Sequence, residues 1–166
     1  MESTFLQIDL QSLFIAAGKN RIDFEKVWDH FNDRDSEHII DSVIYNSQNP
    51  KFNSSKFEAR MKSIGYKMKS KEIFDLDRWS PDISVLVTLD CLMRKDSFDK
   101  WIIMSNNGSF SEVCKYLQGI GKNIEVWEFR NMFDSKLRDY ADSLYYVEDE
   151  FCFEKNISKF GFNKEI

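Results

Sequence analysis

The sequence predicts an α/β protein: a Rossmann-like, three-layer sandwich in which helices cover both faces of a mainly parallel central sheet. Short apolar runs of strand length alternate with amphipathic segments along nearly the whole chain. The run over 101–105 is almost continuously apolar, which is typical of a strand buried on both faces of a parallel sheet, and a second mainly apolar run lies over 124–129. With 166 residues and no Pro/Gly-rich linker, we expect one domain over residues 1–150. Residues 151–166 would be a tail that packs on it or is disordered.

The first half of the chain contains three expected strands and three expected helices. An apolar run over 4–9 predicts a strand, and the helix that follows over 10–18 ends at Gly18. Apolar residues then recur at helical spacing over 23–32. The remaining elements expected here are a strand over 37–45, a helix over 53–64 and a strand over 66–74.

The second half continues the alternation. Ser80 can cap a helix, Pro81 suits a first helical turn and Asp82 complements the helix dipole, so a helix is expected from there to about Arg94. The later elements are a strand over 101–105, a helix over 110–117, a strand over 124–129, a helix over 135–143 and a short strand over 144–147. Ser109 and Glu112 have the spacing of a capping box at the start of the 110–117 helix.

Composition restricts the classes of function. The net charge is −5 and the pI is about 5.1, so any nucleic-acid binding must use a local basic patch. No apolar run reaches the length of a membrane span, and the N-terminus does not resemble a signal peptide. The three cysteines have no Cys-x-x-Cys spacing, which favours a reduced, cytoplasmic protein and argues against structural zinc.

The segment from Asp99 to Val147 carries a recognisable pattern. An apolar strand, a turn beginning at Ser105, a helix, a second apolar strand and another helix follow in order. This order and its residues resemble the second half of an NYN domain, a branch of the PIN-like, metal-dependent ribonucleases. The resemblance covers roughly residues 4 to 150. It implies a parallel sheet whose strand order reverses between the first strand and the 101–105 strand, with a crevice at the reversal.

The acidic positions of the family are only partly kept. Where the family turn usually reads Ser-Gly-Asp-x-Asp-Phe, this chain has Asn107 and Ser109 in place of the two acids. The first strand normally ends in Asp-Gly-x-Asn, and here Asp9 remains but Ser12 replaces the Asn. The middle helix normally carries two Asp residues six apart. Asp90 keeps the second of these, whereas Ser84 stands at the first.

The resemblance therefore implies a depleted metal site. Asp9 and Asp90 would bind Mg²⁺ or Mn²⁺ weakly, with Asp82 and the amide oxygen of Asn107 as further catalytic candidates. Each also has a structural interpretation. Asp9 could be a helix cap, Asp90 a solvated helix residue, Asp82 a partner of the helix dipole, Asn107 a turn residue and Ser109 a helix cap.

A basic strand is the main candidate for substrate binding. Lys67, Lys69 and Lys71 alternate along one predicted strand, and Arg78 follows it. They would form a ridge that contacts phosphates, or they would protect a sheet edge from association. Three serines of the predicted crevice complete the substrate-binding candidates: Ser12, Ser105 and Ser109.

Two functions follow from these features. The first is an RNA-directed NYN protein with weak or no cleavage activity. The alternative is a catalytically dead pseudo-nuclease that serves as a protein-interaction module. A homodimer is compatible with either function, and no membrane association is expected.

Overall fold

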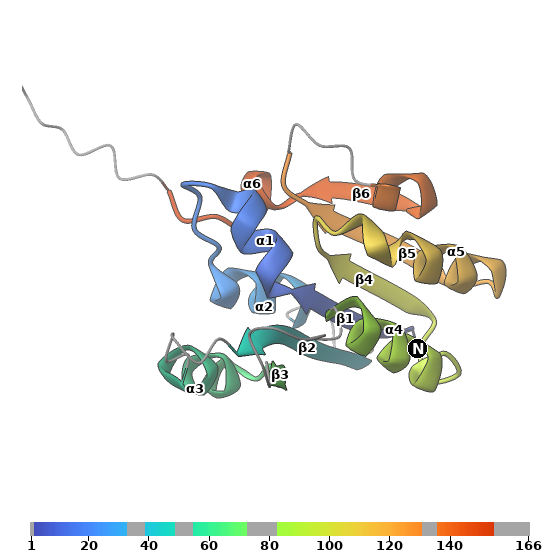
Figure 1. Cartoon of the computed structure of the whole chain (residues 1–166), viewed down its shortest axis with the longest axis horizontal. Helices are drawn as coiled ribbons and strands as arrows, with labels where there is room; N and C mark the ends of the chain where they lie inside the picture. The colour runs from blue at the N-terminus through green and yellow to red at the C-terminus, as the bar shows by residue number, and fades with distance from the viewer. Residues whose placement is uncertain (1, 33–38, 49–54, 73–82, 131–135, 155–166) are drawn as a thin grey trace, which may run out of the picture.

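The computed structural model describes residues 2–32, 39–48, 55–72, 83–130 and 136–154. Its centre is a six-stranded sheet of order β3-β2-β1-β4-β5-β6 in which every neighbouring pair is parallel (Figure 1). The predicted parallel α/β architecture is therefore confirmed. The strands are β1 (Ser3–Asp9), β2 (Ile39–Gln48), β3 (Lys67–Glu72), β4 (Lys100–Met104), β5 (Asn123–Glu128) and β6 (Ser143–Tyr146).

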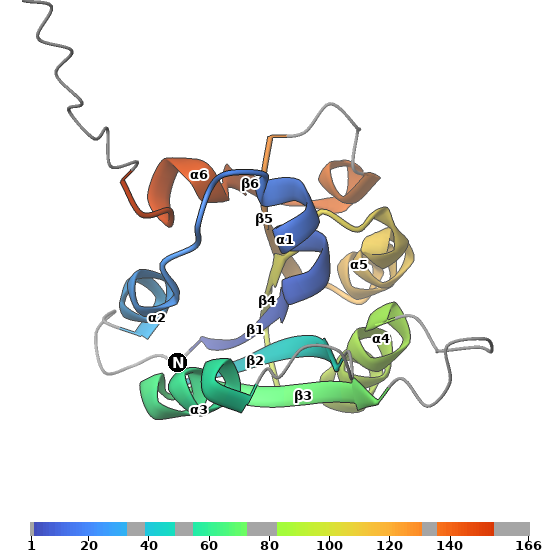
Figure 2. The same ribbon diagram turned by 60° about the vertical axis from the view of Figure 1, so that its left-hand side comes forward.

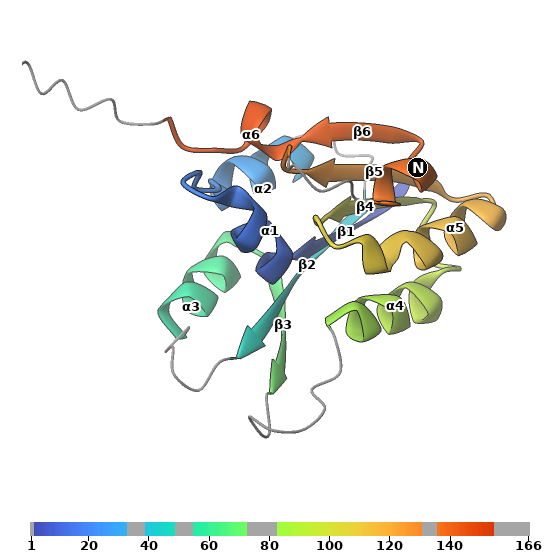
Figure 3. The ribbon, with the colours of Figure 1, turned by 45° about the horizontal axis from the view of Figure 1, so that its top comes forward.

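Helices cover both faces of the sheet. The α-helices are α1 (Leu10–Ala17), α2 (Phe24–Asn32), α3 (Ser55–Ile64), α4 (Ile83–Arg94), α5 (Ser111–Gly119) and α6 (Val147–Glu150). Two 3₁₀ turns, η1 (Gly108–Phe110) and η2 (Lys136–Tyr140), lie in the second half. Helices α4 and α5 pack on one face, and α2, α3 and α6 lie on the other (Figure 2). Figure 3 shows α1 leaving the end of β1 on the same side as α2 and α3.

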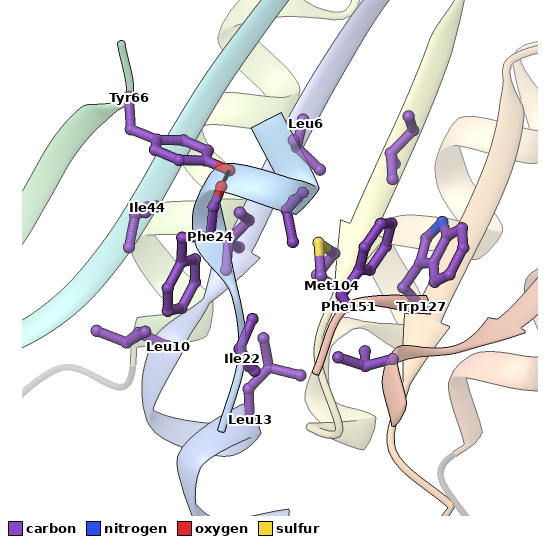
Figure 4. Packing of buried hydrophobic residues seen from close by; sticks show 14 of the residues in the cluster. Leu6, Leu10, Leu13, Ile22, Phe24, Ile44, Tyr66, Met104, Trp127 and Phe151 are labelled. Carbon is purple, nitrogen blue, oxygen red and sulfur yellow. Dashed lines mark hydrogen bonds between the residues drawn. The ribbon is translucent and has the colours of Figure 1, made fainter. Parts of the chain in front are cut away.

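The pleat of the strands divides the apolar residues between two cores, one on each face. Leu6, Ile8 and Trp127 point into the core beneath α1, α2 and α3, and Figure 4 shows this packing. The Tyr66 hydroxyl donates to the Phe24 carbonyl at 2.8 Å and fixes the start of α2 beside β3. The opposite core, beneath α4 and α5, is built from the alternate strand residues. Its members on the strands include Phe5, Val43, Tyr45, Trp101, Ile103, Ile124 and Val126.

The order of the strands reverses between β1 and β4. From β1 the chain proceeds outward through β2 and β3 on one side, and β4, β5 and β6 follow on the other. Parallel α/β sheets bind ligands outside the carboxyl ends of the strands at such a reversal. The end of β1 at Asp9 and the turn after β4 at Ser105 are therefore the positions where a site is expected.

Two local expectations need correction. The helix expected over 135–143 is only the short η2 in the described residues, and Ser143 already begins β6. Asp142 causes this early return to the sheet, because its backbone NH donates to the Ile124 carbonyl and its carboxylate accepts from the Ile124 NH at 2.7 Å. Ser109 is not the helix cap: Asn107 caps η1 instead, and α5 begins after Phe110 without a side-chain cap.

The end of the domain was also only partly foreseen. The short strand expected over 144–147 is β6, but the helix α6 after it was not predicted. Phe151 is buried in the core beside Trp127, and Cys152 forms an antiparallel bridge with Ile22. The expected helix start at residues 80–82 lies outside the described residues. Within the described part of the chain, no helix has the length and apolar character needed to span a bilayer.

Candidate functional site

One row of residues crosses the sheet at its carboxyl edge. Asp9 of β1 is paired with Tyr45 of β2, and Tyr45 is paired with Lys69 of β3. On the other side, Ser105 directly follows β4 and lies level with Glu128, the last residue of β5. Neighbouring strands are about 4.8 Å apart, so these side chains form a continuous polar band on the α4–α5 side of the sheet.

Asp9 lies at the centre of this row and is almost completely buried. One oxygen accepts from the Ser12 NH at 3.3 Å, so that Asp9 caps α1, and the other accepts from the Ser105 hydroxyl at 3.0 Å. The hydroxyls of Ser12 and Ser105 also lie 3.0 Å apart. The structure thus brings Asp9, Ser12 and Ser105 together at the carboxyl edge of the sheet, where the predicted helix cap at Asp9 is confirmed.

The turn after β4 is held in place by its own amides. The Asn106 side chain donates to the Phe129 carbonyl and accepts from the Phe129 NH, both at 2.9 Å. The Asn107 NH donates to the Ser105 hydroxyl at 2.9 Å, and the Asn107 side-chain oxygen accepts from the Ser109 NH at 3.0 Å. The oxygen of Asn107 that was a candidate metal ligand therefore serves the cap of η1.

Asp90 reaches the row from α4 and is bound by a cation of the chain itself. The Lys69 ammonium lies 2.6 and 2.7 Å from the two carboxylate oxygens, and the Tyr45 hydroxyl donates to one of them at 2.6 Å. Only 9% of the Asp90 side chain is exposed, against 40% of the Lys69 side chain. Asp90 is therefore a buried, ion-paired carboxylate and not a solvated helix residue.

Behind Asp90 lies a neutral network that sequence reasoning missed. The Gln7 amide donates to the Tyr45 hydroxyl at 2.9 Å and accepts from the Cys91 thiol at 3.0 Å. Burial raises the pKa of Tyr45 far above its ordinary value, and the hydrogen bond to Asp90 raises it further. Burial likewise raises the pKa of Cys91 to about 12. The Tyr45 hydroxyl and the Cys91 thiol are therefore both neutral near pH 7. One sequence signal could have revealed this network: Gln7 alternates with Phe5 and Asp9 along β1 and so lies on the same face of the sheet.

Glu128 is a third buried carboxylate at this edge, and it was missed because the segment 124–129 was interpreted only as a strand. One of its oxygens accepts from the Arg138 guanidinium of η2 at 2.8 Å. The other is buried without a hydrogen-bond partner among the described residues. The carboxylates on both sides of Asp9 are thus each paired with a basic side chain.

The basic strand β3 lies at the edge of the described sheet, and its residues Lys67 and Lys69 face acids. Lys67 pairs with Asp41 at 2.8 Å, and Arg94 binds the other oxygen of Asp41. Burial acts to raise the pKa of Asp41, but hydrogen bonds from Lys67 and Arg94 outweigh it and lower the pKa overall. The side chain of Lys71, together with Arg78 and Asp82, lies outside the described residues.

The side chains that the structure describes at this edge do not form a donor set suited to a catalytic Mg²⁺ or Mn²⁺ ion. Such ions are held by several converging oxygen ligands that carry net negative charge. In the described residues no group of three or more His, Cys, Asp or Glu side chains is placed to hold a metal. Asp90 is paired with an ammonium group, whereas Asp9 is bound by neutral hydroxyl and NH donors. The charge of one of these two carboxylates is therefore already balanced without a metal.

Comparison with known proteins agrees with this fold. The sequence pattern of the NYN domain matches residues 3–148, and no curated protein matches the chain. A crystal structure of a protein of unknown function from Vibrio parahaemolyticus superposes with a TM-score of 0.77, covering 92% of this chain and 96% of that chain at 19% identity. At this identity the similarity demonstrates a shared fold. The match over residues 3–148 places this chain in the NYN domain family of PIN-like nucleases.

Proposed function

We propose that this chain is an RNA-directed NYN protein whose metal-dependent cleavage is weak or absent, because internal ion pairs replace the metal site. The observation that carries this proposal is the Lys69 ammonium, which binds both oxygens of Asp90. Asp90 is one of only two family acids that the sequence clearly keeps. Its negative charge is already balanced by a residue of the same chain.

The Lys69 ammonium would strongly repel a metal ion at Asp90. A divalent ion about 4 Å from a lysine ammonium is repelled by roughly 8 kcal/mol at an effective dielectric constant of about 20. To bind at Asp90, the ion would have to displace Lys69 and also compete with the Tyr45 hydroxyl. The neutral residues Asn107 and Ser109 supply no charge to offset that cost.

Membership of a nuclease family supports RNA as the target, and the crevice supports weak binding. The turn after β4 presents amide and hydroxyl groups at the carboxyl edge of the sheet. The side chains of Lys67 and Lys69 are 63% and 40% exposed, although their ammonium groups bind carboxylates. A phosphate would compete with Asp41 and Asp90 for them, so we expect low affinity that falls as the salt concentration rises.

A second candidate function is a protein-interaction module, and one surface favours it. Helix α4 buries Val87 and Cys91, yet its opposite side exposes Val85, Leu89 and Met93 by 45, 50 and 81%. An apolar stripe on the solvent side of a helix is typical of a protein contact.

Cleavage assays test the first proposal. Labelled single-stranded and structured RNAs would be incubated with Mn²⁺ and the parent protein, with Asp9→Asn as the matched inactive control. We expect little or no cleavage by the parent and salt-sensitive RNA retention. Rapid cleavage that Asp9→Asn abolishes would contradict the weak-site proposal. Absence of RNA retention at low salt would favour the interaction module.

A combined variant with four substitutions tests the assignment of the site. Ser84→Asp, Asn107→Asp and Ser109→Asp restore the family acids, and Lys69→Met removes the internal cation. We expect this variant to bind Mn²⁺ more tightly than the parent. Equal binding by the two proteins would show that these positions do not form the metal site.

A further inference from the structure

A cavity lies on the face of the sheet opposite α4 and α5, away from the row of polar residues at the carboxyl edge. It has a volume of about 620 Å³ and lies between the C-terminal end of α1, the start of α2 and helix α3. This size falls within the range of small-molecule sites, about 300–1,000 Å³. Its apolar lining includes Phe14, Phe24, Phe57, Met61 and Phe153.

The aromatic floor of the cavity is ordered by contacts between rings. Phe57 of α3 meets Phe14 of α1 and Phe24 of α2 edge to face, with ring centroids 6.3 and 5.7 Å away. Figure 4 shows how Phe24 is anchored by the hydrogen bond from Tyr66. A planar apolar group can pack on such rings in the offset-stacked or edge-to-face geometry that aromatic pairs prefer.

The wall beside the floor is rigid and carries a positive charge. The Asp23 NH donates to the Phe151 carbonyl at 2.7 Å, and the Phe153 NH donates to the Arg21 carbonyl at 2.9 Å, so the Arg21–Asp23 segment is pinned to the end of the domain. The Arg21 guanidinium lies 6.0 Å from the Phe153 ring centroid. Arg21 makes no ion pair with any described residue.

The other charged groups of the lining are already satisfied. Arg60 binds Glu25 at 2.9 Å, and the carboxylate of Asp23 caps α2 through the Lys26 NH at 3.1 Å. The cavity therefore combines an aromatic floor with one guanidinium that forms no ion pair with a described carboxylate, and the Asp23 carboxylate of the same lining is held by the start of α2. A ligand that matches both features has a planar apolar body and a single anionic group.

From this combination we propose that the cavity is a binding site for a small aromatic acid, whose ring packs on Phe57 and Phe24 and whose anion pairs with Arg21. This site is separate from the carboxyl-edge row, because it is lined by α1, α2 and α3 and contains none of the row residues. Its occupancy does not depend on whether the protein acts on RNA.

The test uses 8-anilinonaphthalene-1-sulfonate as an anionic aromatic probe and N-phenyl-1-naphthylamine as its neutral analogue. Fluorescence titration gives the affinity, and methyl NMR of the full chain identifies the site. We expect the sulfonate to bind in one-to-one ratio and to shift the methyl signals of Ile22, Met61 and Ile64. Arg21→Gln should weaken the binding of the sulfonate by about two- to fivefold and leave that of the neutral probe unchanged, since a charge pair at an exposed arginine contributes modestly.

Two kinds of control separate this site from general surface binding. Lys19→Gln removes a charge close to Arg21 in the sequence, and Ile15→Ala removes an exposed apolar side chain of α1. Neither residue lines the cavity, so both variants should bind the two probes as tightly as the parent does. Ile64→Trp partly fills the cavity at a half-buried position and should abolish binding, with circular dichroism confirming the fold. Shifts confined to the methyl groups of Leu89 and Met93, or an equal effect of Arg21→Gln on both probes, would overturn the proposal.

Discussion

Removing the ammonium group of Lys69 should both destabilise the protein and create a weak metal site. Lys69→Met keeps much of the side-chain length but removes the cation that binds both oxygens of Asp90. The Asp90 side chain is only 9% exposed in the parent, and in the variant its carboxylate would keep just the hydrogen bond from the Tyr45 hydroxyl. Breaking a fully buried ion pair costs about 3–5 kcal/mol. Because 40% of the Lys69 side chain is exposed, water can solvate part of the charge, and we expect a loss of about 2 kcal/mol.

Thermal unfolding with and without Mn²⁺ measures both effects. For a domain of this size, a loss of about 2 kcal/mol lowers Tm by about 4–8 °C. Mn²⁺ at millimolar concentration should raise the Tm of Lys69→Met but not that of the parent, because only the variant carries an uncompensated Asp90. Asp90→Asn in the Lys69→Met background should recover much of the stability and remove the response to Mn²⁺.

Lys67→Met is the matched control for this prediction. Lys67 is on the same strand and face, is 63% exposed and pairs with Asp41, which keeps Arg94 as a second partner. We expect a smaller loss of stability and no response to Mn²⁺. If the parent responds to Mn²⁺ as strongly as Lys69→Met does, the reasoning that Lys69 replaces the metal is refuted.

Three further predictions concern acid stability, thiol labelling and a tight backbone approach. Folding lowers the pKa of Asp41 from its ordinary value of 3.8, so the ionised carboxylate contributes its full stabilisation above pH 3.8 and loses it as the pH falls through the folded pKa. In urea unfolding between about pH 4 and pH 2, the free energy of unfolding should therefore fall less in Asp41→Asn than in the parent. Burial raises the pKa of both Cys91 and Cys114 to about 12, so a thiol reagent near pH 8 should label half-buried Cys152 first and the other two only as the chain unfolds; early labelling of Cys91 would contradict this. Gly65 has φ +131° and an added Cβ would lie 2.5 Å from the Trp28 ring, so Gly65→Ala should cost more than about 2 kcal/mol in chemical denaturation, and a neutral effect would show that Trp28 moves aside.

The architecture could be predicted because it depends on short-range patterns. Apolar runs such as 101–105 and the helical spacing in 23–32 are local signals that tertiary contacts did not override. The reversal of the strand order between β1 and β4, and the closeness of Asp9 to the turn at Ser105, were expected from the family resemblance and from the rule that sites form where a parallel sheet reverses.

The partners of the acids could not be predicted, because they come from distant parts of the chain. Lys69 and Asp90 are separated by 21 residues, and Tyr45 and Asp90 by 45. The lysine alternation in β3 was visible in the sequence, but nothing local showed that Lys69 faces an acid on α4. The burial of Glu128 at the end of β5 could not be read from the sequence, and only the fold brings Arg138 within hydrogen-bond distance of its carboxylate.

The exchange of caps at η1 was missed for a related reason. Asn107 and Ser109 both suit a helix start, and the sequence spacing of Ser109 and Glu112 favours Ser109. Ser105 decides the outcome, because its hydroxyl accepts from the Asn107 NH and donates to Asp9. These contacts place Asn107 where its side-chain oxygen accepts from the Ser109 NH, so Asn107 and not Ser109 is the cap.

Direct titration of the parent protein with Mn²⁺, followed by electron paramagnetic resonance of the free ion, is the most decisive measurement. Our account predicts that nearly all added Mn²⁺ stays free at micromolar protein concentrations, and that Asp9→Asn gives the same curve. Stoichiometric uptake at micromolar Mn²⁺ that disappears in Asp9→Asn would mean that the carboxyl edge holds a catalytic ion despite the Lys69–Asp90 pair.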